Sequence, residues 1–364
     1  MSGPEPSEPA PEACAQCLAR TWLLGRLSGH LDVARARILE LLDLADEELI
    51  AAVAGADAPD IAAELAAFEP DGARRRCAAA GVEAICGCHP AYPERLWSLS
   101  AEPAVLHVAG GMDRFLTMAA DDAVAVVGAR TASPYGLDMA RGLARGLAAA
   151  GLVVVSGMAI GIDSAAHEGA LEGGGPTIAV LAAAPDHAYP ASRRALHRRI
   201  LTAGAVVSEL GPGIPARRWM FPARNRIIAA LSQMTVVVAA RIGSGAMLTA
   251  QAAMHLRRLV GAVPGPATAP LSAGPHALLR ADARVITDAG DVMTALWGGA
   301  PTLEYRSVPG PMQPLFHAIA DGFDLLDAFA VAGLDERAGL TALADLELGG
   351  FVRRGLGGRY AVVP

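Results

Sequence analysis

The strongest constraint on the fold of this chain is a change of hydrophobic period at Val82. From there to about residue 298, short β-branched apolar runs alternate with alanine-rich stretches whose apolar residues recur at helical spacing. Strands that are apolar on both faces and are separated by helices are typical of parallel sheets covered by helices on both sides. The sequence therefore predicts a doubly wound α/β domain over residues 82–298.

Seven strands and five helices are predicted within this domain. The strands are Val124–Val127, Val153–Val155, Thr177–Leu181, Val206–Ser208, Thr235–Val238, Val260–Val263 and Arg284–Ile286. The helices cover about 136–150, 161–172, 192–203, 223–232 and 245–257. Ligands of such sheets bind at the carboxyl ends of the strands, where loops lead into helix N-termini.

The flanking segments have a different character. Residues 1–17 are acidic and proline-rich, which predicts a disordered tail, and residues 18–80 show helical periodicity with Gly and Asp punctuation, which predicts a small helical module. A Pro/Gly-rich linker is expected over 299–314. Residues 315–364 read as three helices and a terminal hairpin, the layout of a winged helix.

The predicted wing is basic, with Arg353, Arg354 and Arg359 around its turn. Such a wing contacts DNA phosphates in some proteins, whereas other winged helices bind protein partners. Both alternatives stay open at the level of the sequence.

Composition excludes a membrane-spanning helix. The chain is 53% hydrophobic, but Ala accounts for much of this figure. No run approaches the roughly 18 apolar residues that a spanning helix needs. The N-terminus is the opposite of a signal peptide, so we expect a cytoplasmic protein.

All five cysteines lie before residue 90. The pair Cys14 and Cys17 has metal-ligand spacing, and so, less regularly, does the group Cys86, Cys88 and His89. The irregular spacing, together with the position of the first pair in a predicted tail, favours reduced thiols. We therefore expect no metal and no cofactor.

Positive charge is concentrated in one stretch of an otherwise acidic chain, whose formal net charge is −7. Between residues 192 and 226 a single acid, Glu209, accompanies eight arginines: Arg193, Arg194, Arg198, Arg199, Arg217, Arg218, Arg224 and Arg226. A concentrated basic stretch on an acidic protein indicates a local anion site rather than general affinity for nucleic acid.

The end of this stretch, Phe221–Ile228, is the most informative segment. It places Arg224, Asn225 and Arg226 at the start of a predicted helix, directly after Pro222. Arginine binds phosphate with two hydrogen bonds, and the N-terminus of a helix favours an anion. The alternative is a surface helix whose two arginines are simply solvated.

Loops after three predicted strands resemble phosphate-binding turns. They carry Gly128 and Arg130, then Ser156 and Gly157, and finally Ser244 and Gly245. Each glycine permits a tight turn and a close backbone approach. No dinucleotide fingerprint is present, and the chain has no lysine for a Walker motif. Together with the Arg-Asn-Arg helix start, the loops predict an extended phosphate-binding surface.

Catalytic candidates are few. Asp163 and His167 are four residues apart on a predicted helix, a spacing suited to a metal pair or to acid–base chemistry. The alternative is that Asp163 caps the helix and His167 is packed or exposed. No other catalytic combination stands out, so the pattern favours a binding protein over an enzyme.

Five blocks resemble, in order and spacing, the DNA-processing protein A (DprA) family. They are VVGARTASPYG, VVSGMAIGIDSAAHEGAL, TIAVLAAAPDHAYP, SELGPGIPARRWMFPARNRIIAALS and SGAMLTAQAA. The resemblance is dense over about 90–295 and looser at both ends, where it implies a SAM-like N-terminal module and a winged helix. It implies an extended Rossmann-like, doubly wound domain that binds single-stranded DNA without sequence preference and forms a homodimer. It also implies protection of incoming DNA in natural transformation and help in loading the RecA recombinase.

The resemblance also implies the residues that face DNA: Gly128, Arg130, Ser156, Gly157, Arg218, Phe221, Arg224, Asn225, Arg226, Ser244 and Gly245. Arginines and helix N-termini would hold successive phosphates, while Phe221 offers a face for a base. The chain departs from the family pattern at Ile160, Ala239 and Gly243, where the family usually has Arg, Glu and a basic residue.

Two other functions remain as alternatives. One is a nucleotide-handling hydrolase resembling the cytokinin-activating phosphoribohydrolases, although their Pro-Gly-Gly-x-Gly-Thr-x-x-Glu motif is missing here. The other is an interaction scaffold whose C-terminal domain recruits proteins.

Overall fold

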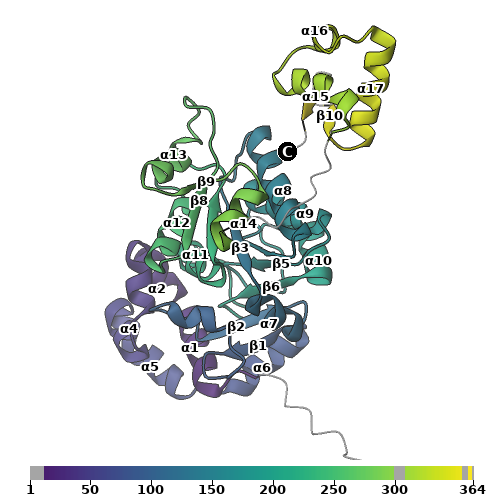
Figure 1. The fold of residues 1–364 in the computed structure, drawn as a ribbon. Coiled ribbons are helices and arrows are strands. Elements are labelled where there is room, and N and C mark those ends of the chain that lie inside the picture. Colours follow the sequence, from purple (N-terminus) through teal and green to yellow (C-terminus); the bar gives the residue numbers. More distant parts are fainter. Residues whose placement is uncertain (1–11, 299–307, 355–359, 363–364) are drawn as a thin grey trace, which may run out of the picture. The chain divides into compact units, whose positions relative to one another are not determined.

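A computed structural model describes residues 12–298, 308–354 and 360–362 (Figure 1). The chain divides into two compact units, Met1–Gly299 and Ala300–Pro364. In the described part, no helix combines the length and the apolar character needed to cross a membrane.

The first unit is built on one nine-stranded sheet with the order β1-β2-β6-β5-β4-β3-β7-β8-β9. Neighbouring strands from β6 to β9 are parallel, whereas β2 pairs antiparallel with β6 and β1 antiparallel with β2. The strands are β1 (Glu83–Cys86), β2 (Val105–Ala109), β3 (Ala123–Val127), β4 (Val153–Ser156), β5 (Thr177–Val180), β6 (Ala205–Ser208), β7 (Met234–Val237), β8 (Leu259–Ala262) and β9 (Arg284–Val285). The predicted doubly wound α/β fold is confirmed.

Helices cover the sheet on both sides, as Figure 1 shows. Pairs of them pack together, α8 with α9 and α11 with α12. The helices are α7 (Met112–Ala120), α8 (Pro134–Ala149), α9 (Ile162–Glu172), α10 (Arg194–Ala203), α11 (Met220–Leu231), α12 (Gly245–His255), α13 (Ala273–Arg280) and α14 (Ala289–Trp297). The five predicted helices are α8 to α12.

The antiparallel edge was missed by the sequence interpretation. Strand β1 is only four residues long and begins with an exposed glutamate, so its apolar signal is weak. Strand β2 is buried throughout but has no crossover helix of the repeating kind before it. Antiparallel additions at the edge of a parallel sheet are common, yet the alternation of strand and helix does not reveal them.

The order of the strands reverses around β3. From β3 the chain adds β4, β5 and β6 on one side, and then returns to add β7, β8 and β9 on the other. Strand β3 is fully buried and pairs in parallel with both β4 and β7. Connections leave in opposite directions at such a switch point, which opens a crevice at the carboxyl ends of the strands.

The N-terminal helices belong to the same compact unit as the sheet. They are α1 (Ala15–Arg26), α2 (Ser28–Val33), α3 (Ile38–Leu42), α4 (Asp46–Val53), α5 (Ala58–Ala66) and α6 (Pro70–Ala79), with the short 3-10 helix η1 (Arg35–Arg37) before α3. Figure 1 shows most of them in purple at the β1–β2 end of the sheet. The prediction of a tail through residue 17 is wrong for residues 12–17, because Cys14 is the N-cap of α1. Residues 1–11 lie outside the described residues.

Trp219 anchors these helices to the sheet domain. The ring is fully buried among leucines of α1, α2 and α4. Its Nε1–H donates to Ser28 Oγ at 3.0 Å, and its backbone N–H donates to Asp32 Oδ1 at 2.9 Å. Because Trp219 directly precedes α11, this contact fixes the N-terminal helices beside the start of that helix.

Truncating this anchor is expected to destabilise the first unit. Trp219→Ala removes a large buried ring and leaves the Ser28 hydroxyl without its donor, so we expect a loss of about 3–5 kcal/mol in the free energy of unfolding. Chemical denaturation followed by circular dichroism measures this loss. The control is Trp97→Ala, because Trp97 is about half exposed. Equal losses in the two variants would contradict the assignment of Trp219 as the anchor.

The second unit contains three helices followed by a strand pair. The helices are α15 (Gln313–Ala320), α16 (Leu325–Val331) and α17 (Glu336–Leu348), and β10 (Val352–Arg354) pairs antiparallel with β11 (Tyr360–Val362). This order agrees with the predicted elements, although α15 begins within the predicted linker. The winged-helix assignment itself stays a prediction. Arg359 and the linker residues 299–307 lie outside the described residues.

Candidate nucleic-acid interface

A hollow of about 770 Å³ opens at the carboxyl ends of the strands around the switch point. Its wall comes from the loop after β3, the start of α11, the first turns of α12 and the segment 35–40 of the N-terminal helices. Of the eleven residues predicted to face DNA, all but Ser156 and Gly157 line this hollow. Segments more than 100 residues apart in the sequence thus form one surface.

The loops after β3, β4 and β7 touch through their backbones. Ala129 N–H donates to Ala239 O at 2.7 Å, and Ile162 N–H donates to Ala129 O at 3.2 Å. Gly161 has φ +91°, and a Cβ there would lie 2.3 Å from Ala129 O. Only glycine permits this approach, so the convergence inferred from the three loops has a direct backbone basis.

Arg224 lies inside the protein beneath the hollow. Only 7% of the residue is exposed, and its Nη1 donates to Val180 O at 2.6 Å. The guanidinium covers Gly157, where a Cβ would lie 1.8 Å from Nη1. Burial lowers the pKa of Arg224 to about 10, against the opposing attraction of Asp163. Gly157 is therefore needed to seat Arg224.

Arg226 makes more hydrogen bonds within the protein than Arg224 does. Its Nη1 and Nη2 bind the Glu209 carboxylate at 3.0 and 2.7 Å, and its Nε donates to Ala101 O at 2.8 Å. A further bond runs from Nη1 to Ala223 O at 2.6 Å, and only 4% of the residue is exposed. Since most of the five N–H groups of this guanidinium have protein partners, Arg226 organises the site from within.

The interpretation of Phe221–Ile228 therefore needs correction. We expected Arg224 and Arg226 either to grip phosphate or to be solvated, and the structure shows both buried with internal hydrogen bonds. The sequence pattern shows that arginines occur at a helix start, but it does not show which face of the helix they occupy.

The exposed cations of the hollow come from other segments. Arg130 and Arg218 are exposed, as are Arg35 and Arg37 of η1. Arg37 Nε forms an ion pair with Glu40 at 2.8 Å, so Arg37 is less available to a ligand than Arg130 and Arg218 of the same wall. The contribution of segment 35–40 was missed, because the sequence interpretation saw no chemistry in the N-terminal helices.

Aromatic groups stand beside these cations. The Cζ of Arg130 lies 5.3 Å from the centroid of the Phe221 ring, within cation–π range. The ring of Tyr189 lies 5.5 Å from that of Phe221, and Tyr189 is about half exposed. Tyr189 was also missed, although it belongs to one of the sequence blocks that resemble the family.

The N-terminus of α12 forms another part of the wall. Asn225 Nδ2 donates to Gly245 O at 3.1 Å, which ties α11 to this helix. Ser244 is the N-cap of α12, but its side chain makes no capping hydrogen bond. The Ser244 Oγ lacks a partner among the described residues, so the start of α12 retains polar groups beside the hollow.

Ser156 faces the sheet rather than the hollow. It is fully buried, and its Oγ donates to Val126 O at 2.7 Å. Of the three departures from the family pattern, Ile160 and Gly243 are exposed, whereas Ala239 is buried and uses its carbonyl to accept from Ala129.

Asp163 and His167 lie under the site. Helix α9 has Gly161 as its N-cap, so Asp163 is not the cap that one interpretation expected. Burial is the largest influence on Asp163 and raises the pKa of its carboxyl. The Thr177 hydroxyl donates to Val154 O and accepts from His167 Nδ1 at 2.7 Å. Burial and Arg224 lower the pKa of His167 to about 3, which agrees with a packed, neutral histidine.

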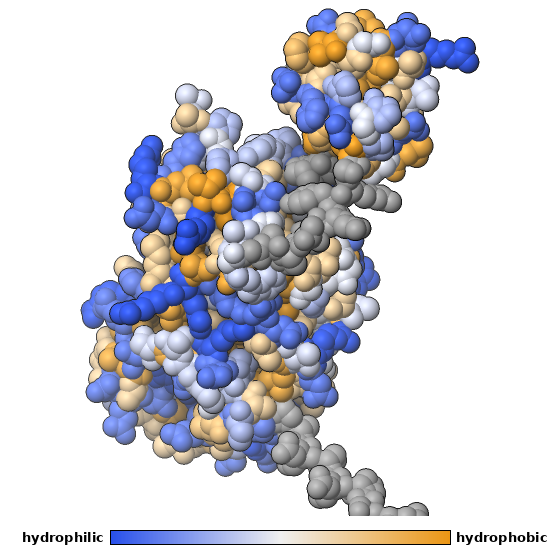
Figure 2. Space-filling model, viewed as in Figure 1, coloured by the Kyte–Doolittle hydropathy of each residue, from blue (hydrophilic) through white to orange (hydrophobic). Residues whose placement is uncertain are grey.

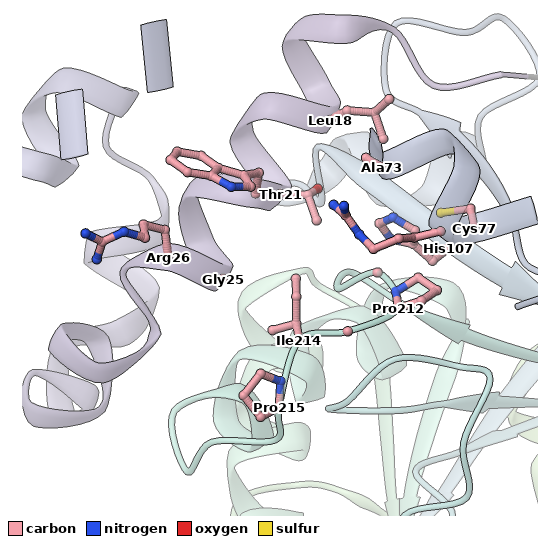
Figure 3. Close-up of a pocket in the computed structure, with 14 residues that line it drawn as sticks. Leu18, Thr21, Gly25, Arg26, Ala73, Cys77, His107, Pro212, Ile214 and Pro215 are labelled. Atoms are coloured by element: carbon pink, nitrogen blue, oxygen red, sulfur yellow. The ribbon is translucent and has the colours of Figure 1, made fainter. Parts of the chain in front are cut away.

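A second hollow of about 370 Å³ lies between α1, α6 and the loop at 211–215 (Figure 3). Its wall is largely apolar, and Ile214 lies against Gly25 of α1. His107 reaches it from β2, and burial lowers the pKa of His107 to about 4. Arg26 in its wall is paired with Glu64 at 2.7 Å, whereas Arg76, which also lines it, is exposed.

Figure 2 shows a belt of hydrophilic residues that crosses the first unit between its N-terminal helices and the rest of the sheet domain. Arg224 and Arg226 are buried, so the hydrophilic character of this belt comes from other side chains that are exposed.

Fold and site together define a class: a Rossmann-like protein with an extended, arginine-lined hollow at its switch point. The family model described as DNA recombination-mediator protein A matches residues 83–297, and the chain belongs to this family.

Several relatives and solved structures are similar to the chain. A putative DNA processing protein DprA of Mycobacterium tuberculosis H37Rv is 44% identical over 229 residues, which are 63% of this chain and 53% of that protein. DprA of Streptococcus pneumoniae R6 is 39% identical over 202 residues, 56% of this chain and 70% of that protein. The chain spans about half the length of the first of these relatives.

The X-ray structure of DprA from Streptococcus pneumoniae matches with a TM-score of 0.63 at 30% identity and covers 76% of this chain and 97% of that one. A structure of DprA from Helicobacter pylori, which concerns the single-stranded DNA binding mode of that protein, matches with a TM-score of 0.53 at 26% identity. It covers 60% of this chain and 96% of the other.

The Arg226–Glu209 pair is expected to stabilise the fold far more than any exposed arginine. Arg226→Ala leaves a buried carboxylate unpaired, so we expect a loss of about 3–5 kcal/mol in the free energy of unfolding. Arg218→Ala changes an exposed side chain and is expected to stay within about 0.5 kcal/mol of the wild type. Denaturant titration of both variants measures the difference, and similar values would contradict the structural role of Arg226.

Buried histidines are expected to make the fold labile in mild acid. The pKa of His167 is about 3 in the folded protein and about 6.5 in an unfolded chain. The unfolded state therefore binds the proton first, and stability present above pH 6.5 is lost as the pH falls toward 3. His107, with a folded pKa of about 4, acts in the same direction.

For each such histidine the loss is about 1.4 kcal/mol per pH unit below 6.5. Urea denaturation between pH 7 and pH 4 measures it. His167→Gln should be less stable at pH 7 but should lose less stability on acidification, and an unchanged pH slope in that variant would count against this account.

Proposed function

We propose that the protein binds single-stranded DNA in the hollow at the switch point, without preference for sequence. The observation that carries the proposal is the grouping of exposed Arg130 and Arg218 with the Phe221 ring in the wall of this hollow, where the Tyr189 ring packs beside that of Phe221. Cations that follow a backbone, combined with aromatic faces for bases, are the physical basis of sequence-tolerant single-strand binding.

Several features favour a single strand over a duplex. An unpaired base has a free face that can lie on Phe221 or Tyr189, whereas the faces of bases in a duplex are stacked. A hollow of about 770 Å³ accommodates individual nucleotides, but a duplex is too wide to enter it. The start of α12 adds backbone N–H groups and the Ser244 hydroxyl as phosphate donors.

The eleven predicted residues divide, in this proposal, into two groups. Arg130, Arg218 and Phe221 contact the strand, together with the Ser244–Gly245 start of α12. The remaining polar residues shape the site from beneath: Ser156, Arg224, Asn225 and Arg226. Gly128 and Gly157 permit the close backbone and side-chain approaches on which this shape depends.

The proposed role is not catalytic. The acid–base candidates expected from the sequence, Asp163 and His167, are both buried below the hollow. No observation favours the hydrolase alternative.

Membership of the family suggests further partners of the protein and a cellular role. We propose that the protein forms a homodimer, protects incoming strands in natural transformation and assists RecA loading in the cytoplasm. The relatives named DNA processing protein DprA support this cellular role. Size-exclusion chromatography with light scattering tests the dimer, and a monomer at micromolar concentration would contradict it.

Binding to labelled single-stranded and double-stranded DNA tests the proposed function. Arg130→Ala combined with Arg218→Ala is expected to weaken single-strand affinity about tenfold or more and to lower the slope of log K against log salt by about 0.7 for each lost phosphate contact. The same variant should unfold at the wild-type denaturant concentration, since both side chains are exposed.

The matched control is Arg198→Ala, an exposed arginine of α10 that does not line the hollow. It removes the same charge and should leave affinity nearly unchanged. Equal losses in the control and the double variant would show a general effect of net charge and would contradict this location of the site.

A further inference from the structure

Four cysteines from opposite ends of the N-terminal region come together in the folded chain. The sulfurs of Cys14, Cys17, Cys86 and Cys88 all lie within 4.8 Å of one another. Cys17 and Cys88 are separated by 71 residues in the sequence. The sequence favoured reduced thiols without a metal, but this grouping was not foreseen, and we propose that these four residues form a structural zinc site.

The distances fit a single tetrahedral ion. With zinc–sulfur bonds of about 2.3 Å, the sulfurs of a tetrahedral site are about 3.8 Å apart. Cys17 Sγ lies 3.7 Å from Cys88 Sγ. A disulfide would bring two sulfurs to about 2.05 Å, and all four cysteines are free. An iron–sulfur cluster binds its cysteines through different irons, which holds their sulfurs farther apart than one ion does.

The four ligands come from two rigid elements. Cys14 is the N-cap of α1 and Cys17 lies in its first turn, while Cys86 ends β1 and Cys88 lies two residues further on. The backbone N–H of Cys14 points at Cys86 Sγ at 3.4 Å. Backbone donors of this kind stabilise thiolate, and the N-terminus of α1 adds a favourable field for negative charge.

The residues around the four cysteines neither engage the sulfurs in another function nor replace them as ligands. Cys86 is buried beside Ala13, Leu18 and Val105, which form a small apolar shell. His89, adjacent to Cys88, accepts a hydrogen bond from Ala91 N–H through its Nδ1, so it is not needed as a ligand. Four protein ligands leave no open position, which is typical of a structural rather than a catalytic zinc site.

The site would link the N-terminal helix to the edge of the sheet. It joins α1 to β1, whose only partner in the sheet is β2. Zinc is favoured over other ions because four soft thiolates in a tetrahedral arrangement suit it and exclude magnesium and calcium. Zinc binding of this kind contributes directly to the free energy of folding.

The full chain purified under reducing conditions tests the proposal by elemental analysis. We expect a single zinc ion per chain and release of that ion by a thiol-blocking mercurial. Cobalt substitution should give thiolate-to-cobalt charge transfer and the d–d bands of a tetrahedral site. Removing zinc with a chelator should lower the melting temperature on the order of 10 °C, and added zinc should restore it.

The matched variants are Cys88→Ser and Cys77→Ser. Cys88 is exposed, so its replacement disturbs packing little and should abolish zinc binding. Cys77 is the one cysteine outside the cluster, and its variant should keep the ion even if it is less stable. Zinc-free protein whose melting temperature does not respond to added zinc would overturn the proposal. So would iron at the site, or disulfides among these cysteines in protein from a reducing cytoplasm.

Discussion

The geometry of the hollow depends on one buried ion pair, Arg226 with Glu209. The guanidinium of Arg226 joins three segments: α11, the end of β6 through Glu209, and the loop before β2 through Ala101. Such a pair is costly to desolvate, so it does not stabilise the fold more than apolar packing of equal volume would. The pair instead fixes the position of α11, because the planar guanidinium of Arg226 reaches its several partners from only one placement of that helix.

Once α11 is placed, the rest of the site follows from it. Trp219, directly before the helix, fixes the N-terminal helices, and these bring Arg35 and Arg37 to the wall. Asn225 ties the helix to the start of α12, and Arg224 lies across Gly157. The buried arginines thus form a scaffold, and the exposed ones, Arg130 and Arg218, remain at the surface.

Much of the fold could be predicted because periodicity reports burial. All seven parallel strands and the helices α8 to α12 between them were predicted from alternating apolar runs, whereas α13 was missed. The edge strands β1 and β2 did not, because the first is short and neither belongs to the strand–helix repeat. At the site, nine of the eleven residues expected at strand ends and helix starts line one hollow. The burial of Arg224 and Arg226 could not be predicted, since the arginines of one helix turn can face either inward or outward.

The sequence by itself determined the doubly wound sheet, the position of the candidate site and the family to which the chain belongs. These properties depend on local patterns: period, turn chemistry and ordered motifs. Tertiary structure alone decided which arginines are buried, that Tyr189 packs beside Phe221, that the segment 35–40 borders the hollow, and that four cysteines meet. The physical reason is that a side chain's partner and its exposure are set by elements far away in the sequence. Cys17 and Cys88 show this most directly: 71 residues separate them along the chain, and 3.7 Å separates their sulfurs in the fold.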